Sequence, residues 1–304
     1  MRRMKASAFC FVLLASFGCL QLAGCAGAQA PPAETNDKPK PQDAQSTAIV
    51  DEVMKQFQAE RVVFDGKAGT VTIPAVVNQP PDPVEYLLIH KRGKRHEAMF
   101  WTPSKPSVIN AALLMLGMTP GQNATYTEKK PAPTLQEIEN GADPLIITPP
   151  KGTTFWMTAK WKGEDGKEVE HCVEDLILDM SSGKAVADCS WVYLGGRMAR
   201  IYKNDPEVYI ADFEGNLISI CYLSPDNHLG TMSHDSARDD QNWWMTDAMP
   251  KAETEVQFVF HRQPSALHKE RQARLLREKE AARKGDADKG AAKKPDEKKP
   301  DEKK

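Results

Sequence analysis

The chain has 304 residues, of which 40 are Lys or Arg and 42 are Asp or Glu, and its formal net charge is −2 at pH 7. This total hides an acidic middle, because residues 25–264 hold 23 basic and 33 acidic side chains, a net charge of −10. A nucleic-acid platform needs a basic surface that displaces counterions from phosphates, so we expect no nucleic-acid partner.

The N-terminus has the layout of a secretory signal. Residues 1–5 hold three basic side chains and no acid, and an apolar stretch follows from Ala6 to Leu22. Leu22-Ala23-Gly24-Cys25 resembles the lipobox of bacterial lipoproteins, in which the cysteine is acylated and the preceding peptide bond is cut. We therefore predict a signal peptide over residues 1–24 and a lipid-bearing Cys25 that anchors the protein to a lipid bilayer.

A second cleavage site keeps an alternative open. Ala28-Gln29-Ala30 fits the Ala-x-Ala site of an ordinary secreted protein, but Pro31 would then follow the cut, which signal peptidases disfavour. The position and flanks of Cys25 favour the lipoprotein. Ala26, where an inner-membrane retention signal would have Asp, favours the periplasmic side of the outer membrane.

Segments with few large apolar residues flank the body of the chain. Residues 25–47 are predicted to be a disordered linker, because they cannot bury enough surface to fold. Residues 263–284 combine high helix propensity with only a few leucines, which predicts an exposed charged helix. Residues 285–304 repeat Lys-Lys-Pro-Asp-Glu and are predicted to be a disordered tail. A basic arm that touches anionic lipid or cell-wall polymer is the alternative for this end.

Residues 48–262 are long enough for one domain with a sizeable core. Short segments of alternating apolar and polar residues, broken by turn residues, predict strands and hairpins. In chain order we expect strands at 61–65 and 71–78, a hairpin over 84–102, a helix over about 104–117, a hairpin over 153–179 turning at Asp165-Gly166, a strand at 190–194, a hairpin over 208–223, and a strand at 255–261. This pattern predicts an α+β fold, mainly antiparallel β with one packed helix.

Three segments stand out in this part of the chain: Val84 to Ile89, the run Gly93-Lys94-Arg95-His96-Glu97, and Ala111 to Gly117 with Pro120-Gly121 after it. Together they resemble the YdjY-domain family of exported bacterial proteins. The resemblance covers Ala48 to about Pro264 and implies no particular reaction. Some members have a ferredoxin-like label, but this chain lacks the Cys-x-x-Cys-x-x-Cys run of an iron–sulfur site, and we predict no cofactor.

His96-Glu97 suggests a metal or acid–base site. The zinc-protease helix needs a second His four residues after the first, and position 100 is Phe. In the expected strand His96 and Glu97 point to opposite faces, which favours a structural pair. If the motif marks a binding site, Glu85, Lys94 and His96 are expected to converge, because Glu85 lies on the paired strand.

Three cysteines lie in the body of the chain: Cys172, Cys189 and Cys221. An exported protein is disulfide-permissive, so one disulfide and one odd thiol is the simplest arrangement, and the spacing leaves the pair open. A zinc site that adds His171 or His228 has no supporting Cys-x-x-Cys or His-x₃-His spacing.

Residues 226–247 hold acids, histidines and tryptophans without periodicity, which predicts a long surface loop pinned by its tryptophans. A calcium-binding or sugar-binding loop is the alternative. We predict a non-enzymatic envelope domain that binds an envelope protein or a cell-wall polymer through the hairpin and loop side of its sheet. The alternative is a metal-binding or redox-linked envelope protein that uses His96, Glu97 and the body cysteines.

Overall fold

The structure, a computed structural model, describes residues 41–80 and 82–291. All of these except residues 41–45, which begin the first helix, belong to the unit that runs from Ser46 to Lys304. The predicted signal peptide, Cys25 and residues 25–40 of the predicted linker lie outside the described residues, as do residues 292–304 of the predicted tail. Residues 41–47 of the predicted linker belong to a helix.

Most of the regular structure is β-strand. The helices are α1 (Pro41–Ala59), α2 (Pro106–Met115), α3 (Leu135–Glu139), α4 (Ile210–Glu214) and α5 (Ala266–Ala291), with 3₁₀ turns η1 (Arg95–Glu97), η2 (Val173–Leu176) and η3 (Asp235–Arg238). The strands are β1 (Val63–Asp65), β2 (Thr70–Val77), β3 (Tyr86–His90), β4 (Ala98–Thr102), β5 (Thr125–Glu128), β6 (Leu145–Thr148), β7 (Thr154–Lys162), β8 (Glu168–Cys172), β9 (Ile177–Asp179), β10 (Lys184–Ala185), β11 (Ser190–Tyr193), β12 (Met198–Ala199), β13 (Val208–Tyr209), β14 (Asn216–Ser219), β15 (Gly230–Ser233), β16 (Trp243–Met245) and β17 (Glu255–His261).

No helix within residues 41–80 and 82–291 combines the length and the apolar character that a membrane span requires.

Eight strands close into a barrel. Their order is β2-β17-β7-β11-β15-β14-β3-β4, and β4 pairs back to β2 through Trp101 with Val76 and Phe100 with Val77. Most neighbours are antiparallel, but β14 with β15 and β3 with β4 run parallel. Outside the ring, β1 pairs with β2 and β8 pairs with β7. Because the ring is closed, its strands leave few unpaired backbone groups at an edge.

The barrel interior is filled by alternate residues of each strand. On β2 half-buried and buried residues alternate, and Val71, Ile73, Ala75 and Val77 are the buried ones. The ring of Phe258 on β17 lies 5.7 Å from that of Phe100 and 5.3 Å from that of Phe260, measured between centroids. Inward residues therefore pack against one another in one large apolar cluster, and Tyr86, Ile89 and Ala98 form a second, small cluster.

The expected α+β fold, mainly antiparallel with one packed helix, is wrong. Helix α2 lies where a helix over 104–117 is expected, and its buried face packs against β2 and α4. However, α1 buries Phe57, α4 buries Ile210 and Ala211, and α5 buries His268. The helix expected over residues 263–284 corresponds to α5, but it is docked at its start and not fully exposed. No apolar stripe marks the buried positions of α1, α4 and α5, because each buries only one or two residues.

Two of the three expected hairpins are also absent. β3 and β4 are parallel neighbours, so residues 91–97 run back to the end of the sheet where β3 begins, and β4 starts there. Residues 210–214 form α4, because Gly215 at φ +80° ends a helical turn instead of supplying a hairpin turn. The alternation in 153–179 does form the antiparallel pair β7 and β8, with Gly166 at φ +77° in its turn.

Residues 226–247 are not a long loop. They contain β15, η3 and β16, and β16 pairs with β9. Trp243 on β16 is fully buried, so this segment is fastened to the domain by a core side chain.

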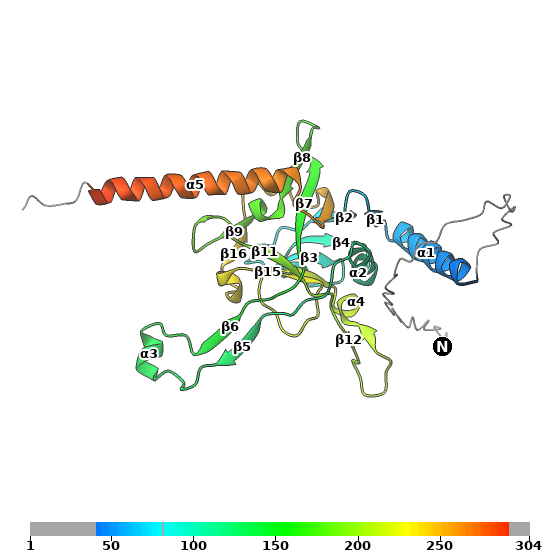
Figure 1. Ribbon diagram of the computed structural model, residues 1–304, viewed down its shortest axis with the longest axis horizontal. Coiled ribbons are helices and arrows are strands. Elements are labelled where there is room, and N and C mark those ends of the chain that lie inside the picture. The colour runs from blue at the N-terminus through cyan, green and yellow to red at the C-terminus, as the bar shows by residue number, and fades with distance from the viewer. Residues whose placement is uncertain (1–40, 81, 292–304) are drawn as a thin grey trace, which may run out of the picture. The chain divides into compact units, whose positions relative to one another are not determined.

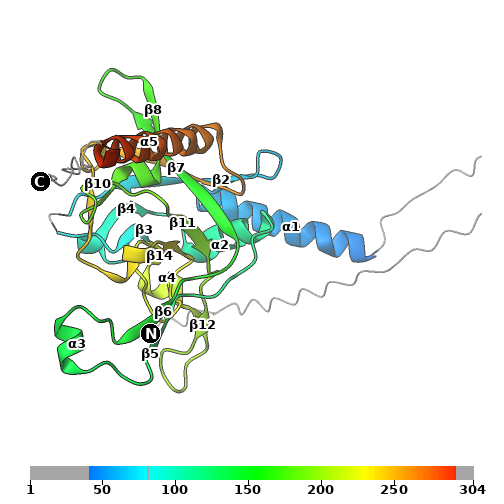
Figure 2. The same cartoon turned by 60° about the vertical axis from the view of Figure 1, so that its left-hand side comes forward.

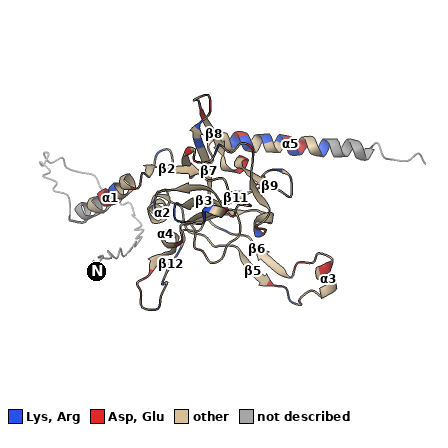
Figure 3. Ribbon diagram, turned by 180° about the vertical axis from the view of Figure 1, so that it is seen from behind, with Lys and Arg blue, Asp and Glu red and all other residues tan. Residues whose placement is uncertain are grey.

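Several elements extend from the barrel (Figures 1 and 2). The arm of β5 and β6 has α3 at its tip, and α5 starts beside β8 and continues outward (Figures 1 and 2). Basic and acidic residues are mixed along the coloured part of α5 (Figure 3). The first turns of α5 are nevertheless docked on the barrel, which matters for the side chains beneath it.

Candidate functional site

The four residues singled out in the sequence lie around the start of β3 and β4. Glu85 directly precedes β3, Lys94 directly precedes η1, and η1 contains His96 and Glu97. The Glu85 amide donates to the Glu97 carbonyl oxygen at 2.9 Å, so the backbone itself joins the two segments. This contact arises from the parallel pairing of β3 and β4 and not from a hairpin.

Their side chains form one cluster, here named the Glu85–Glu97 cluster and consisting of Glu85, Lys94, His96 and Glu97. Lys94 Nζ lies 3.1 Å from Glu97 Oε2 and 4.0 Å from Glu85 Oε2. His96 Nε2 lies 3.0 Å from Glu97 Oε1. The expectation that His96 and Glu97 point to opposite faces is wrong, because they occupy a 3₁₀ turn and not a strand.

Electrostatics set Glu85 apart from an ordinary surface acid. Burial raises the pKa of its carboxyl group, the charge of Glu97 and a hydrogen bond with Glu97 raise it further, and Lys94 opposes the shift. Beneath the cluster, burial and the same two acids raise the pKa of Tyr86, and Lys94 Nζ lies 5.8 Å from the Tyr86 ring centroid. The two carboxyl groups thus lie beside one shared cation, Lys94.

The cluster is chemically able to exchange protons, but its polar atoms are engaged with one another. The His96 side chain is 72% exposed and contacts only its sequence neighbour among the ion pairs of the described residues. The cluster lines neither the hollow beside His90 nor the one beside Lys151. These contacts are better suited to holding the β3–β4 connector, residues 91–97, in place than to binding a substrate.

A basic hollow lies at the opposite end of β3, where the chain leaves the strand. It has a volume of about 430 Å³ and is lined by Ala59, Glu60, Arg61, His90, Lys91, Arg92, Pro103 and Lys105. Four of these side chains are cations and one is an acid, so the hollow is strongly positive within an acidic body. An anion would find complementary charge there.

His90 gives the hollow a buried polar wall. The side chain is only 2% exposed, and neither ring nitrogen meets hydrogen-bond geometry with a partner in the described part of the chain. Burial lowers the pKa of His90, and Arg92 and Lys91 lower it further, although the Pro103 carbonyl opposes them. A buried imidazole whose nitrogens lack a well-aligned partner in the described residues is unusual, and it marks this wall of the hollow as a candidate binding surface.

Arg61 reaches the hollow through an unusual backbone conformation. It follows α1 with φ +56°, the position where a helix usually ends on Gly. A left-handed conformation costs a non-Gly residue about 1 kcal/mol. Sequence reasoning missed this hollow, because Arg61, His90-Lys91-Arg92 and Lys105 come together only once α1 and β3 are placed.

Comparison with known proteins bears on both sites. Residues 62–261 match the YdjY domain. The chain belongs to the YdjY domain family. The matched region includes the Glu85–Glu97 cluster and most of the residues that line the basic hollow. A search of curated proteins and a search of solved structures each found no match.

The three body cysteines of the YdjY domain are free thiols in the structure. Burial, followed by the charge of Glu174, raises the pKa of Cys172 to about 12. Burial also raises the pKa of Cys189 and of Cys221. The thiolate is the reactive form of cysteine, so these environments do not favour a nucleophilic or disulfide-exchanging cysteine.

One group of side chains in the described residues is close enough to share a metal ion: Cys172, Glu174 and His268. It does not include His96 or Glu97, and it uses neither His171 nor His228. Sequence reasoning missed Glu174 and His268. No sequence motif links these two residues to Cys172. His268 lies on α5, beyond the residues that match the YdjY domain, so it is far from Cys172 in the chain.

Proposed function

We propose that this chain is a lipid-anchored protein of the cell envelope whose YdjY domain is a non-enzymatic binding module for an anionic group. The basic hollow is the observation that supports this proposal most strongly. It joins four cations and an unpartnered, buried His90 in a space large enough for a small ligand group. The pairing within the Glu85–Glu97 cluster favours binding over catalysis, because its acids and bases contact one another.

The cations of the hollow are available to a ligand. Within the described residues, none of Arg61, Lys91, Arg92 and Lys105 forms an ion pair with a protein carboxylate. Glu60, the one acid, accepts a hydrogen bond at 3.0 Å from the backbone amide of Lys105. Arginine binds carboxylates and phosphates through paired hydrogen bonds, so either group fits the proposal.

The proposed place of action follows from the leader. A signal peptide over residues 1–24 and an acylated Cys25 would put the domain on the periplasmic side of a bilayer, with the outer membrane favoured. Two or more acyl chains are needed for stable anchoring. The partner would then be an anionic group of an envelope protein or of a cell-wall polymer, with no nucleic acid involved.

The binding proposal is tested by titrating the full chain with inorganic phosphate and with citrate at low salt. The first probe represents a phosphate ligand and the second a carboxylate. We expect Arg92→Ala to weaken binding of the preferred probe roughly tenfold, since a hydrogen bond to a charged group is worth about 1.5–3 kcal/mol. Lys151→Ala is the matched control, because it removes one cation from the other hollow. Binding of neither probe, or equal loss in both variants, would contradict the proposal.

Anchoring is tested separately by mass spectrometry of the mature N-terminus. We expect a chain that begins at an acylated Cys25, and a Cys25→Ser chain that no longer partitions into detergent. A mature chain that retains Met1, or one that begins unacylated at Pro31, would exclude the anchor while leaving the binding result intact.

A further inference from the structure

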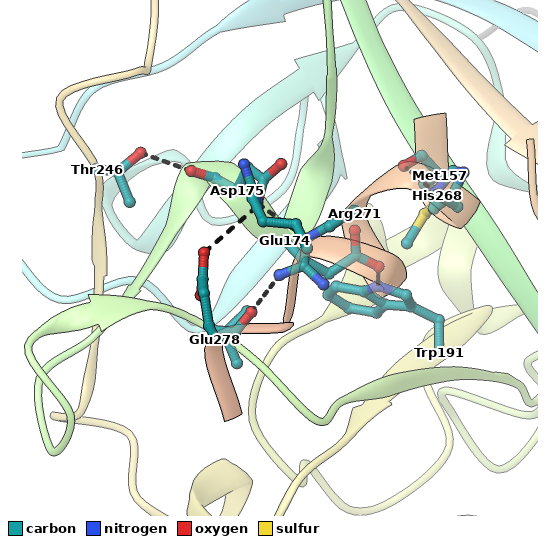
Figure 4. A network of polar contacts seen from close by, with 10 residues as sticks. Met157, Glu174, Asp175, Trp191, Thr246, His268, Arg271 and Glu278 are labelled. Atoms are coloured by element: carbon teal, nitrogen blue, oxygen red, sulfur yellow. Dashed lines mark hydrogen bonds and ion pairs between the residues drawn. The ribbon is translucent and has the colours of Figure 1, made fainter. Parts of the chain in front are cut away.

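A buried polar pocket lies between α5 and the barrel. Cys172 ends β8, Glu174 lies in η2, and His268 lies in the first turn of α5. All three side chains are buried, and each offers one ligand atom within 4.8 Å of the other two. Figure 4 shows Glu174 beside the Trp191 ring, with His268 and Arg271 brought in by α5.

Glu174 is only half satisfied by the protein. Its Oε1 accepts a hydrogen bond at 2.8 Å from Trp191 Nε1, whereas its Oε2 has no partner in the described residues. The residue is only 5% exposed, so solvent does not replace the missing partner. A buried polar atom without a partner costs about 1–3 kcal/mol, and more if it is charged. Something must therefore compensate this oxygen or neutralise it.

His268 is oriented in the way that metal-binding histidines are. Its Nε2 lies 3.2 Å from the carbonyl oxygen of Met157, and its Nδ1 lies 2.7 Å from the hydroxyl of Ser265. If Nε2 carries the proton and donates it to that carbonyl, the lone pair of Nδ1 accepts the hydrogen bond of the Ser265 hydroxyl, which a metal ion at Nδ1 would have to displace. A backbone carbonyl that holds the second ring nitrogen is the usual outer partner of a histidine ligand.

We propose that Cys172, Glu174 and His268 form a binding site for a divalent metal ion, with zinc as the expected ion. Zinc takes thiolate, imidazole and carboxylate ligands together, and three protein ligands leave a fourth position open. On binding, Cys172 and Glu174 each release one proton to solvent and His268 stays neutral. The two negative charges that result balance the charge of the ion.

The surrounding charges permit this exchange of two protons for one metal ion. Arg271 and Arg274 both pair with Asp175, at 2.8 and 2.9 Å, so one negative charge offsets part of the positive charge beside the pocket. Burial raises the pKa of Glu174 as well as that of Cys172, so protons and a metal ion compete for these two side chains. A metal ion competes with those two protons, so its affinity should increase with pH.

The site would tie α5 to the barrel. Its ligands come from β8, η2 and α5, and His268 lies outside the residues that match the YdjY domain. The bound ion would therefore order the base of this helix on a domain that otherwise holds the helix through the buried His268 and through ion pairs of Arg271, Arg274 and Lys279. This role is independent of anion binding in the basic hollow.

The test uses the full chain, stripped with chelator and titrated with Co²⁺, which reports thiolate ligation through a charge-transfer band. We expect one ion per chain and a band that disappears in Cys172→Ala. Cys221→Ala is the matched control, because Cys221 is also a buried free thiol but lies outside the group. A Cys221→Ala spectrum equal to that of the wild type is expected.

A second variant covers the case in which Cys172→Ala does not fold. Glu174→Gln keeps the size of the side chain and an acceptor for Trp191. Loss of a residue that only hydrogen-bonds to a metal ligand weakens metal binding roughly 10- to 100-fold, so loss of the Glu174 ligand should weaken Zn²⁺ binding at least as much. Slower hydrogen exchange at the start of α5 on addition of Zn²⁺ is also expected. A folded wild type that binds no stoichiometric ion, or a band that survives in Cys172→Ala, would overturn the proposal.

Discussion

Gly93 and Gly215 meet backbone to backbone. A Cβ on Gly93 would lie 2.6 Å from the carbonyl oxygen of Gly215, and a Cβ on Gly215 would lie 2.7 Å from the amide nitrogen of Gly93. The same Gly215 oxygen accepts the amide of His90 at 2.7 Å. This contact holds the β3–β4 connector against the end of α4, and the connector links the basic hollow at Arg92 to the Glu85–Glu97 cluster.

Gly93→Ala should therefore destabilise the domain. The new methyl group collides with backbone that cannot rotate away, and overpacking of this kind costs about 1–3 kcal/mol. Urea denaturation of the variant measures the loss. Gly166→Ala is the comparison, because its Cβ meets nothing within 4 Å and it changes only a left-handed turn. The close contact is not important if Gly93→Ala is as stable as the wild type.

Glu85→Gln should change how stability depends on pH. The pKa of Glu85 is raised in the folded protein, mainly by burial, so the native state binds its proton more tightly than the unfolded chain does. The stabilisation from this proton is present below the unfolded pKa and is lost as pH rises through the folded pKa. Gln cannot lose a proton, so the variant should gain stability relative to the wild type as pH rises above about 4.5.

Denaturation with urea at a series of pH values from 4 to 8 tests this expectation. The difference between Glu85→Gln and the wild type should grow across the acidic part of that range and then level off. A constant difference would show that the Glu85 carboxyl group is not shifted by its surroundings. Loss of stability at neutral pH would instead show that the ion pair with Lys94 outweighs the burial of Glu85.

Local sequence pattern predicts the elements of this fold better than their arrangement. Alternation identifies β7 and β8, and Pro106 with Gly117 identifies α2, because these signals lie within a few residues of one another. Closure of the barrel through Val76 and Trp101, like the parallel pairing of β3 and β4, depends on contacts between separate strands. No short-range pattern specifies such a register.

The candidate sites show the same contrast between local sequence signals and long-range arrangement. Glu85, Lys94 and Glu97 can be chosen from the sequence, although the expected reason, a hairpin, is not the actual one. The basic hollow needs α1 placed beside the end of β3, which no local signal provides. The pair of Cys172 with His268 needs α5 docked on β8, and the polar composition of α5 favours exposure instead.

Arg271→Ala should loosen α5 from the barrel. The Arg271 side chain is only 12% exposed, and it donates both to Asp175 and to the carbonyl oxygen of Val186. Its removal leaves two half-buried acceptors without this partner, which should cost about 2–3 kcal/mol. Hydrogen exchange of the α5 amides and urea denaturation measure the effect.

Arg274→Ala is the matched control for that variant. Arg274 contacts the same carboxylate at 2.9 Å from the same helix, but its side chain is 52% exposed. An exposed ion pair contributes about 0–1 kcal/mol, so this variant should stay close to the wild type. Equal effects of the two substitutions would mean that burial of Arg271 does not determine how α5 is held.

His228→Gln should flatten the loss of stability in acid. His228 is fully buried, its Nε2 has no partner in the described residues, and burial lowers its pKa to about 4 against the opposing charge of Asp226. The unfolded chain therefore binds a proton more readily than the native state does. Stability is lost as pH falls from about 6.5 toward 4, by up to about 3 kcal/mol from this group.

Burial also lowers the pKa of His261 to about 4, with His268 adding to the shift, so His261→Gln should remove a separate part of the same pH dependence. A His228→Gln protein that loses stability in acid as steeply as the wild type would show that water reaches this imidazole in the native state.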